Sequence, residues 1–255
     1  MGHWYNSIGE PCYNAGLREA RKQGYLPSVT TIDKIISNPG LDTWKQNVII
    51  ETCIANPFKG EIDDKEYIDW IKKEAFRDSR QKAKLGTVVH HLAERYIQGK
   101  PLFFQGARSD VWEIFQPLKD WIDINLMEPK KGVSSSEGCE IVLVNENFGY
   151  AGKADLLTND TLGNLTLLDY KTTFLTEKDI KKDGTLKKVK IYPSWGRQLA
   201  ALNEVAKAER VLSVVISTNK DFLGVWIVEW TQKELDKYFE EFHHALILYR
   251  LINKL

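Results

Sequence analysis

Cysteine is scarce in this 255-residue chain, which contains only Cys12, Cys53 and Cys139 and no Cys-x-x-Cys pair. Small disulfide-stabilised folds use a denser and even set of cysteines, and cysteine-ligated zinc sites use closely spaced pairs. The sequence therefore predicts neither kind of cross-link. A reducing compartment suits such a chain, so we expect an intracellular, cytoplasmic protein.

A net charge is also missing, because 35 Lys and Arg residues balance 35 Asp and Glu residues. A nucleic-acid-binding surface would then have to come from local clusters of lysine. No apolar run is long enough to span a bilayer, and the first residues lack the basic and apolar regions of a signal peptide. A glycine-rich phosphate loop and internal repeats are absent as well. We expect a sizeable α/β domain with no membrane partner.

A hairpin in the middle of the chain carries two carboxylates and a lysine. Its strands are expected at 150–157 and 165–170, separated by the turn-forming segment Asn-Asp-Thr-Leu-Gly-Asn. Asp155 lies in the first strand, and Asp169 and Lys171 lie at the end of the second. Side chains two residues apart in a strand point to the same face, so Asp169 and Lys171 point the same way. The two carboxylates and the ammonium can therefore converge.

Phosphodiester hydrolysis needs such a set of groups. Carboxylates hold Mg²⁺ or Mn²⁺, which activates water and offsets charge on the phosphate, and a lysine can orient the water or stabilise the transition state. The pattern Gly-x-x-Asp at Gly152 to Asp155, followed by Asp-x-Lys at 169–171, resembles the PD-(D/E)XK nuclease superfamily. That resemblance implies a restriction-endonuclease-like α/β core, a mixed sheet flanked by helices. An isolated Asp-x-Lys has an alternative interpretation, because this pattern also occurs at ordinary solvated strand ends.

A helix expected at 84–99 adds a histidine and a glutamate. His90 and Glu94 lie four residues apart and so share a helix face. In isolation they would be read as a packed pair. The order Gly-x-x-x-His-x-x-x-Glu before Gly-x-x-Asp and Asp-x-Lys resembles the RecB-type branch of the superfamily, which implies that His90 binds the metal and that Glu94 supports the site. His91 lies about 100° round the helix and has no such role.

The resemblance also implies further metal ligands. The backbone carbonyl of Tyr170 is one of them. Glu140, near the start of the strand expected at 139–145, is a second candidate, and an exposed glutamate at a strand end is the alternative.

A glutamine in the helix expected at 195–208 completes the candidate site. Gln198 stands in a segment that resembles the Gln-x-x-x-Tyr segment of the family, which implies support for Lys171 or for the substrate. Leu202 occupies the position of the tyrosine, and its side chain has no aromatic ring to stack.

A run of lysines follows the candidate catalytic strand. Such runs are usually solvated loops, but beside a nuclease site this one can contact DNA phosphates. The candidate DNA-binding residues are Lys178, Lys181, Lys182, Lys187, Lys188 and Lys190.

Two short segments narrow the resemblance. Pro-Ser-Val-Thr at 27–30 and Leu-x-x-Trp-Lys at 41–45 resemble the mitochondrial genome maintenance exonuclease and its bacteriophage relatives. This implies a DNA exonuclease acting on single-stranded ends, in a bacterial or phage-infected cell, with replication, recombination or repair proteins as partners. The lack of a cysteine quartet argues against iron–sulfur relatives.

Two alternatives stay open, an endonuclease or nickase on the same core and a catalytically inactive nucleic-acid-binding protein. Inactive relatives lose the lysine or an acid, whereas Asp155, Asp169 and Lys171 are all present here. For the domains, we expect a helical N-terminal portion at 1–85 packed on a nuclease core at 86–255, one compact domain in all. Whether the N-terminal helices and the lysine run cover the site decides between exonuclease and endonuclease.

Overall fold

The chain divides into two compact units. The computed structural model describes residues 3–36, 38–60, 63–102, 109–126 and 138–255. One unit consists of Met1–Ile35 with Val89–Leu255, and the other is Ile36–Val88. The division differs from the expected boundary after residue 85, because the first 35 residues belong to the unit that contains the sheet.

The larger unit is built on a five-stranded mixed sheet in the order β3-β4-β5-β6-β7. Neighbouring strands are antiparallel except β5 and β6, which are parallel. A parallel pair requires a crossover connection, and helix α7 lies in that connection. This arrangement confirms the mixed α/β fold that the sequence predicts. The strands are β3 (Cys139–Asn145), β4 (Tyr150–Asn159), β5 (Leu165–Thr173), β6 (Arg210–Ser217) and β7 (Val225–Glu229).

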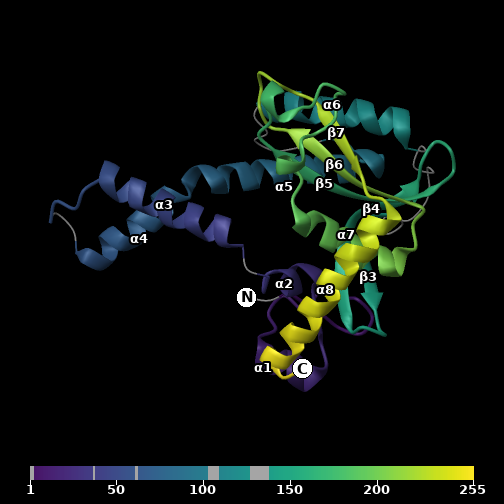
Figure 1. Cartoon of the computed structure of the whole chain (residues 1–255), viewed down its shortest axis with the longest axis horizontal. Helices are drawn as coiled ribbons and strands as arrows, with labels where there is room; N and C mark the ends of the chain where they lie inside the picture. The colour runs from purple at the N-terminus through teal and green to yellow at the C-terminus, as the bar shows by residue number, and fades with distance from the viewer. Residues whose placement is uncertain (1–2, 37, 61–62, 103–108, 127–137) are drawn as a thin grey trace. The chain divides into compact units, whose positions relative to one another are not determined.

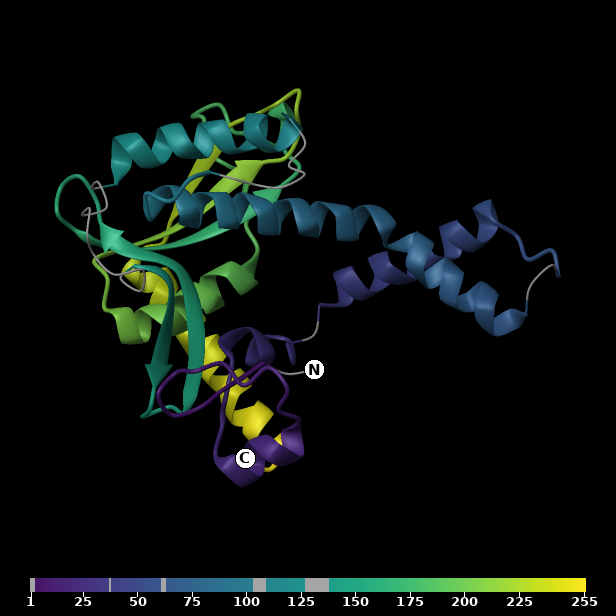
Figure 2. The ribbon, with the colours of Figure 1, turned by 180° about the vertical axis from the view of Figure 1, so that it is seen from behind.

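Helices cover both faces of this sheet. Helix α6 (Ser109–Asn125) and the part of α5 (Arg77–Ile97) that belongs to this unit lie on one face, and α7 (Pro193–Ala206) and α8 (Gln232–Asn253) lie on the other (Figures 1 and 2). Helix α8 begins at a capping box formed by Thr231 and Glu234. None of the helices in the described part of the chain is long and apolar enough to cross a lipid bilayer.

The first residues pack onto the sheet unit through short elements. Strands β1 (Trp4–Tyr5) and β2 (Leu26–Pro27) pair with each other, and helices α1 (Leu17–Gln23) and α2 (Val29–Asp33) flank β2. A cap shapes the start of α2, and two contacts fasten the segment to the core. Ser28 caps α2 by accepting the Thr31 N–H at 3.1 Å, and its backbone forms a bridge with Ala151 of β4. Arg197 of α7 donates to Asp33 at 2.5 Å. These contacts explain why residues 1–35 belong with the sheet.

The smaller unit is helical. It contains α3 (Pro39–Ala55), α4 (Asp64–Ala75) and the beginning of α5. Asn38 caps α3 and Asp63 caps α4 through their side-chain oxygens. Ring contacts join Trp44 to Phe76 at a centroid distance of 6.1 Å. This unit therefore relies on local caps and aromatic contacts.

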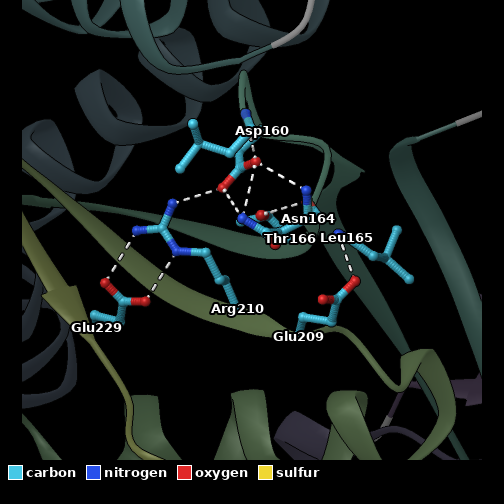
Figure 3. Close-up of polar contacts among 8 residues, drawn as sticks. Asp160, Asn164, Leu165, Thr166, Glu209, Arg210 and Glu229 are labelled. Carbon is cyan, nitrogen blue, oxygen red and sulfur yellow. Dashed lines mark hydrogen bonds and ion pairs between the residues drawn. The ribbon is translucent and has the colours of Figure 1, made fainter.

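The turn between β4 and β5 is tied to the two strands beyond it (Figure 3). Asp160 Oδ1 accepts the N–H groups of Leu162 and Asn164, each at 2.9 Å, which shapes the expected turn. Its Oδ2 accepts from Arg210 of β6 at 2.8 Å, and Arg210 also binds Glu229 of β7 at 2.9 and 3.0 Å. The Arg210 guanidinium thus links the β4–β5 turn, β6 and β7.

Candidate active site

Strands β4 and β5 separate at the candidate site. Their last paired residues on this side are Leu156 and Leu168. Just beyond that pair, Asp155 Oδ2 accepts the backbone N–H of Tyr170 at 2.7 Å. In a continuous antiparallel ladder the Tyr170 N–H would donate to a backbone carbonyl of β4. Here it donates to the carboxylate of Asp155 instead. This contact places Asp155 at the fork between the two strands.

Asp169, Lys171 and Gln198 form a closed ring of polar contacts. The Lys171 ammonium lies 2.5 Å from Asp169 Oδ2 and donates to Gln198 Oε1 at 3.0 Å. Gln198 Nε2 donates in turn to Asp169 Oδ1 at 3.0 Å. Asp169 and Lys171 thus meet on the face of β5 that α7 covers, as the alternation of side chains predicts. The ring fixes the direction of the ammonium.

His90 approaches the fork from α5. Its Nδ1 lies 3.4 Å from Asp155 Oδ2, and its ring packs edge-on against Tyr170 with centroids 5.7 Å apart. Tyr170 points away from Asp169 and Lys171, so His90 and Gln198 reach the fork from opposite faces of the sheet. The structure therefore brings together His90, Asp155, Asp169, Lys171 and Gln198.

Burial and neighbouring charges shift the titration of these groups. Burial raises the pKa of Asp169 to about 6, an effect that Lys171 opposes and the charge of Asp155 reinforces. Burial also acts to raise the pKa of Asp155, but hydrogen bonding and charge from His90, together with the Tyr170 N–H, hold it below its usual value. For His90, burial disfavours the imidazolium, yet the pKa is raised because Asp155 and then Asp169 stabilise the charged ring.

Glu94 and Glu140 make contacts apart from that group. Glu94 Oε2 lies 3.4 Å from His91 Nδ1, and Glu94 Oε1 accepts from Gln98 at 3.3 Å. His90 and Glu94 share a helix face, as expected. They do not form an ion pair, because the His90 side chain contacts Asp155. Glu140 forms an ion pair with Lys153 of the neighbouring strand.

The glycine of the Gly-x-x-Asp pattern lies where two helices approach β4 closely. A Cβ on Gly152 would lie 2.8 Å from Leu202 Cδ2 and 2.8 Å from Val29 Cγ2. Leu202 is 1% exposed. Leu202 is therefore a core residue, and it fills the space beside a residue that has no side chain.

The lysine run folds into a small lobe after β5. It contains the short helices η1 (Glu177–Asp179) and η2 (Lys188–Lys190), and Leu175 and Leu186 are buried at its base. Several of its lysines hold the lobe together. Lys187 Nζ donates to the backbone carbonyl of Lys178, Lys190 lies 3.3 Å from Asp179, and Lys181 donates to Thr185 at 3.2 Å. Lys182 and Lys188 are exposed.

Trp195 is a neighbour of the site that sequence reasoning treated only as the start of a helix. The centroid of its ring lies 6.0 Å from Lys171 Nζ, within the range of a cation–π contact. Its position three residues before Gln198, hence on the same face of α7, is the signal that would have identified it.

The donors at the fork are two carboxylates and one imidazole, a set whose hard oxygen atoms suit Mg²⁺ or Mn²⁺. Asp169 Oδ2 is buried, and the Lys171 ammonium lies beside it. Apart from that contact, it accepts no hydrogen bond from the residues that the structure describes. In the same described ranges, no three His, Cys, Asp or Glu side chains are gathered closely enough to enclose a metal ion. The chemistry of the donors thus fits a divalent ion, while their present contacts are with one another.

Comparison with known proteins provides distant likenesses. No protein-family model matches the chain, and no curated protein matches it in sequence. A Eubacterium rectale protein named as a candidate exonuclease is similar in structure with a TM-score of 0.45 and 14% identity, over 67% of this chain and 68% of that one. The protein SSO0001 is similar with a TM-score of 0.34 and 13% identity, over 83% of this chain and 87% of its own. Likenesses at this level assign no activity.

Proposed function

We propose that this protein is a divalent-metal-dependent deoxyribonuclease with a PD-(D/E)XK site, acting as an exonuclease on single-stranded DNA ends. One observation carries the proposal. At the fork between β4 and β5, Asp155 and Asp169 lie beside an ammonium, Lys171, that Gln198 and Asp169 hold in a fixed direction. The preference for single-stranded ends rests on the resemblance at 27–30 and 41–45.

Mg²⁺ or Mn²⁺ is the proposed cofactor. Asp155 and Asp169 would hold it, with His90, the Tyr170 carbonyl and Glu140 as further proposed ligands. The buried Asp169 Oδ2, which accepts no hydrogen bond from the described residues except through its contact with the Lys171 ammonium, is the feature that supports this assignment. When bound, such an ion supplies Lewis-acid activation of water and of the phosphate.

The side chains of the chain have separate tasks in this scheme. Lys171 directs its ammonium toward the water or the developing charge on the phosphate, and its contacts with Gln198 and Asp169 set that direction before substrate arrives. His90 holds the carboxylate of Asp155 from the opposite face of the sheet. Glu94 contacts His91 and Gln98 on its own helix, and its proposed role is to support the site from the turn of α5 that follows His90.

The lysine lobe is the proposed DNA-binding element. Its base is fixed by buried Leu175 and Leu186, whereas lysine ammonium groups on its surface can meet backbone phosphates. Lysines that also hold the lobe together keep only part of their hydrogen-bonding capacity for DNA. The proposed phosphate contacts are Lys178, Lys181, Lys182, Lys187, Lys188 and Lys190.

The test is a cleavage assay on four substrates of one sequence, linear and covalently closed circular DNA, each single-stranded and double-stranded. Degradation of the linear single strand in Mg²⁺, with none in EDTA and none by Lys171→Ala, is the expected result. Comparable cleavage of closed circles would replace the exonuclease by the endonuclease alternative. Tight DNA binding without cleavage in Mg²⁺ or in Mn²⁺ would favour the alternative of a catalytically inactive nucleic-acid-binding protein.

A further inference from the structure

The start of α7 places Trp195 beside the candidate catalytic lysine and Tyr192 against Trp195. The Trp195 ring centroid lies 6.0 Å from Lys171 Nζ, and Gln198 accepts from the same ammonium at 3.0 Å. Tyr192, immediately before the helix, packs edge-on against Trp195 with centroids 5.1 Å apart. The aromatic pair and Gln198 are therefore carried by α7 and the residue that precedes it, and both face Lys171 of β5 through Trp195 and Gln198.

The two rings differ in their surroundings. Trp195 packs against the apolar cluster that contains Leu175 and Leu186, so its ring is anchored. Tyr192 is 45% exposed. The proline that follows, Pro193, restricts Tyr192 to an extended backbone, as its φ of −90° and ψ of 133° show. An exposed ring is thus held on a stiff backbone against an anchored one, and this arrangement lowers the entropy lost when a flat ligand stacks on it.

We propose that Tyr192, backed by Trp195, stacks the base of the nucleotide next to the scissile phosphate in a single-stranded substrate. The inference rests on the proposed function, which places that phosphate at Lys171. A nucleotide carries its base one sugar away from its phosphate, so a ring that packs against Trp195, the aromatic neighbour of the lysine, is placed to meet the adjacent base. Every base has a π-face, so this contact tolerates any sequence.

The same contact defines a substrate class. In a duplex each base is already stacked and paired, and it must leave the stack before it can meet a protein ring. An unpaired base meets the ring without that cost. The Tyr192 subsite therefore favours single-stranded ends over blunt duplex ends through base contact, whereas lysine contacts to phosphates act on both.

Binding measurements isolate the stacking contact from catalysis. The full chain is titrated, in Ca²⁺, with fluorescent thymidine oligonucleotides from which one base at a time has been removed while every phosphate is kept. Loss of the stacked base should weaken binding by wild type about tenfold at one position, the order of a single base–aromatic stack. Tyr192→Ala should bind the intact and that abasic oligonucleotide equally, and Tyr192→Phe should keep the difference.

The matched control is Trp112→Ala, which removes a comparably exposed ring, 37% against 45%, from α6. It should discriminate as wild type does. Equal affinity of wild type for all the oligonucleotides, or undiminished discrimination by Tyr192→Ala, would overturn the inference even if Mg²⁺-dependent cleavage is intact. Discrimination that is lost in Tyr192→Ala, in a protein that fails to cleave DNA in Mg²⁺, would uphold the stacking subsite and reject the nuclease.

Discussion

Asp155 Oδ2 accepts the backbone N–H of Tyr170 at 2.7 Å, at the point where β4 and β5 stop pairing. The hydrogen bond satisfies a donor that the fork leaves without a backbone partner, and it also directs the carboxylate into the site. The same oxygen lies 3.4 Å from His90 Nδ1. The hydrogen bond that completes the fork between β4 and β5 is therefore the same one that positions Asp155.

Lys171→Ala should lower the turnover number for DNA cleavage by about 10²–10³-fold, because a preorganised charge at the transition state is lost. Gln198→Ala should lower it less, since the ammonium stays but loses one of the two contacts that direct it. Single-turnover kinetics with saturating Mg²⁺ measures both. Near wild-type turnover by Lys171→Ala would assign the catalytic role to another residue.

His90→Ala should reduce apparent Mg²⁺ affinity or turnover by about 10–100-fold, because the side chain that holds Asp155 is removed. His91→Ala is the matched control on the next position of α5, where the side chain contacts Glu94 instead. A metal titration of cleavage rate compares the two. Equal effects would mean that this helix contributes packing alone.

Gly152→Ala should destabilise the fold by about 1–3 kcal/mol, because the new methyl group overlaps Leu202 and Val29. Gly16→Ala is the control, since a Cβ there meets nothing within 4 Å among the described residues. Urea unfolding of both variants measures the difference. An unchanged midpoint for Gly152→Ala would show that α2 and α7 do not press on β4.

Asp160→Asn should lower the melting temperature near neutral pH, and the deficit should shrink in acid. Arg210 and the Asn164 contacts hold the pKa of Asp160 below its usual value. A depressed folded-state pKa contributes stability that is present above the unfolded pKa of about 4 and is lost as pH falls through the folded pKa. Thermal melts of variant and wild type across that range measure it, with Asp69→Asn at an exposed position of α4 as the control. A deficit independent of pH would point to shape rather than charge.

Lys182→Ala and Lys188→Ala should weaken DNA binding and each lower the slope of log affinity against log salt by about 0.7, the value for one phosphate on a single strand. The lysines are exposed on the lobe, so the chemistry at Lys171 should proceed at its wild-type single-turnover rate. Lys237→Ala on α8 serves as the control. Unchanged salt dependence in both lobe variants would place the DNA elsewhere.

Local sequence pattern was sufficient for the elements that carry the acids. Two runs of strand-forming residues and the Asn-Asp-Thr-Leu-Gly-Asn turn between them predicted the hairpin that became β4 and β5. These features depend on neighbours within a few residues, so sequence alone reveals them. The convergence of Asp169 and Lys171 belongs to the same class, because it follows from the two-residue period of a strand.

Local sequence pattern did not predict the contacts between segments that are distant along the chain. Sequence spacing offered Glu94 as the neighbour of His90, but the tertiary structure turns His90 to Asp155, which comes from another element. Nothing local separated residues 1–35, which belong to the sheet unit, from residues 36–88, and nothing local predicted that Leu202 would be buried beside Gly152. Sequence by itself determined which chemical groups this protein can use and on which elements they lie. Only the packing of α5 and α7 on opposite faces of the forked sheet decided which of those groups meet, because such contacts depend on the positions of whole elements rather than on spacing along the chain.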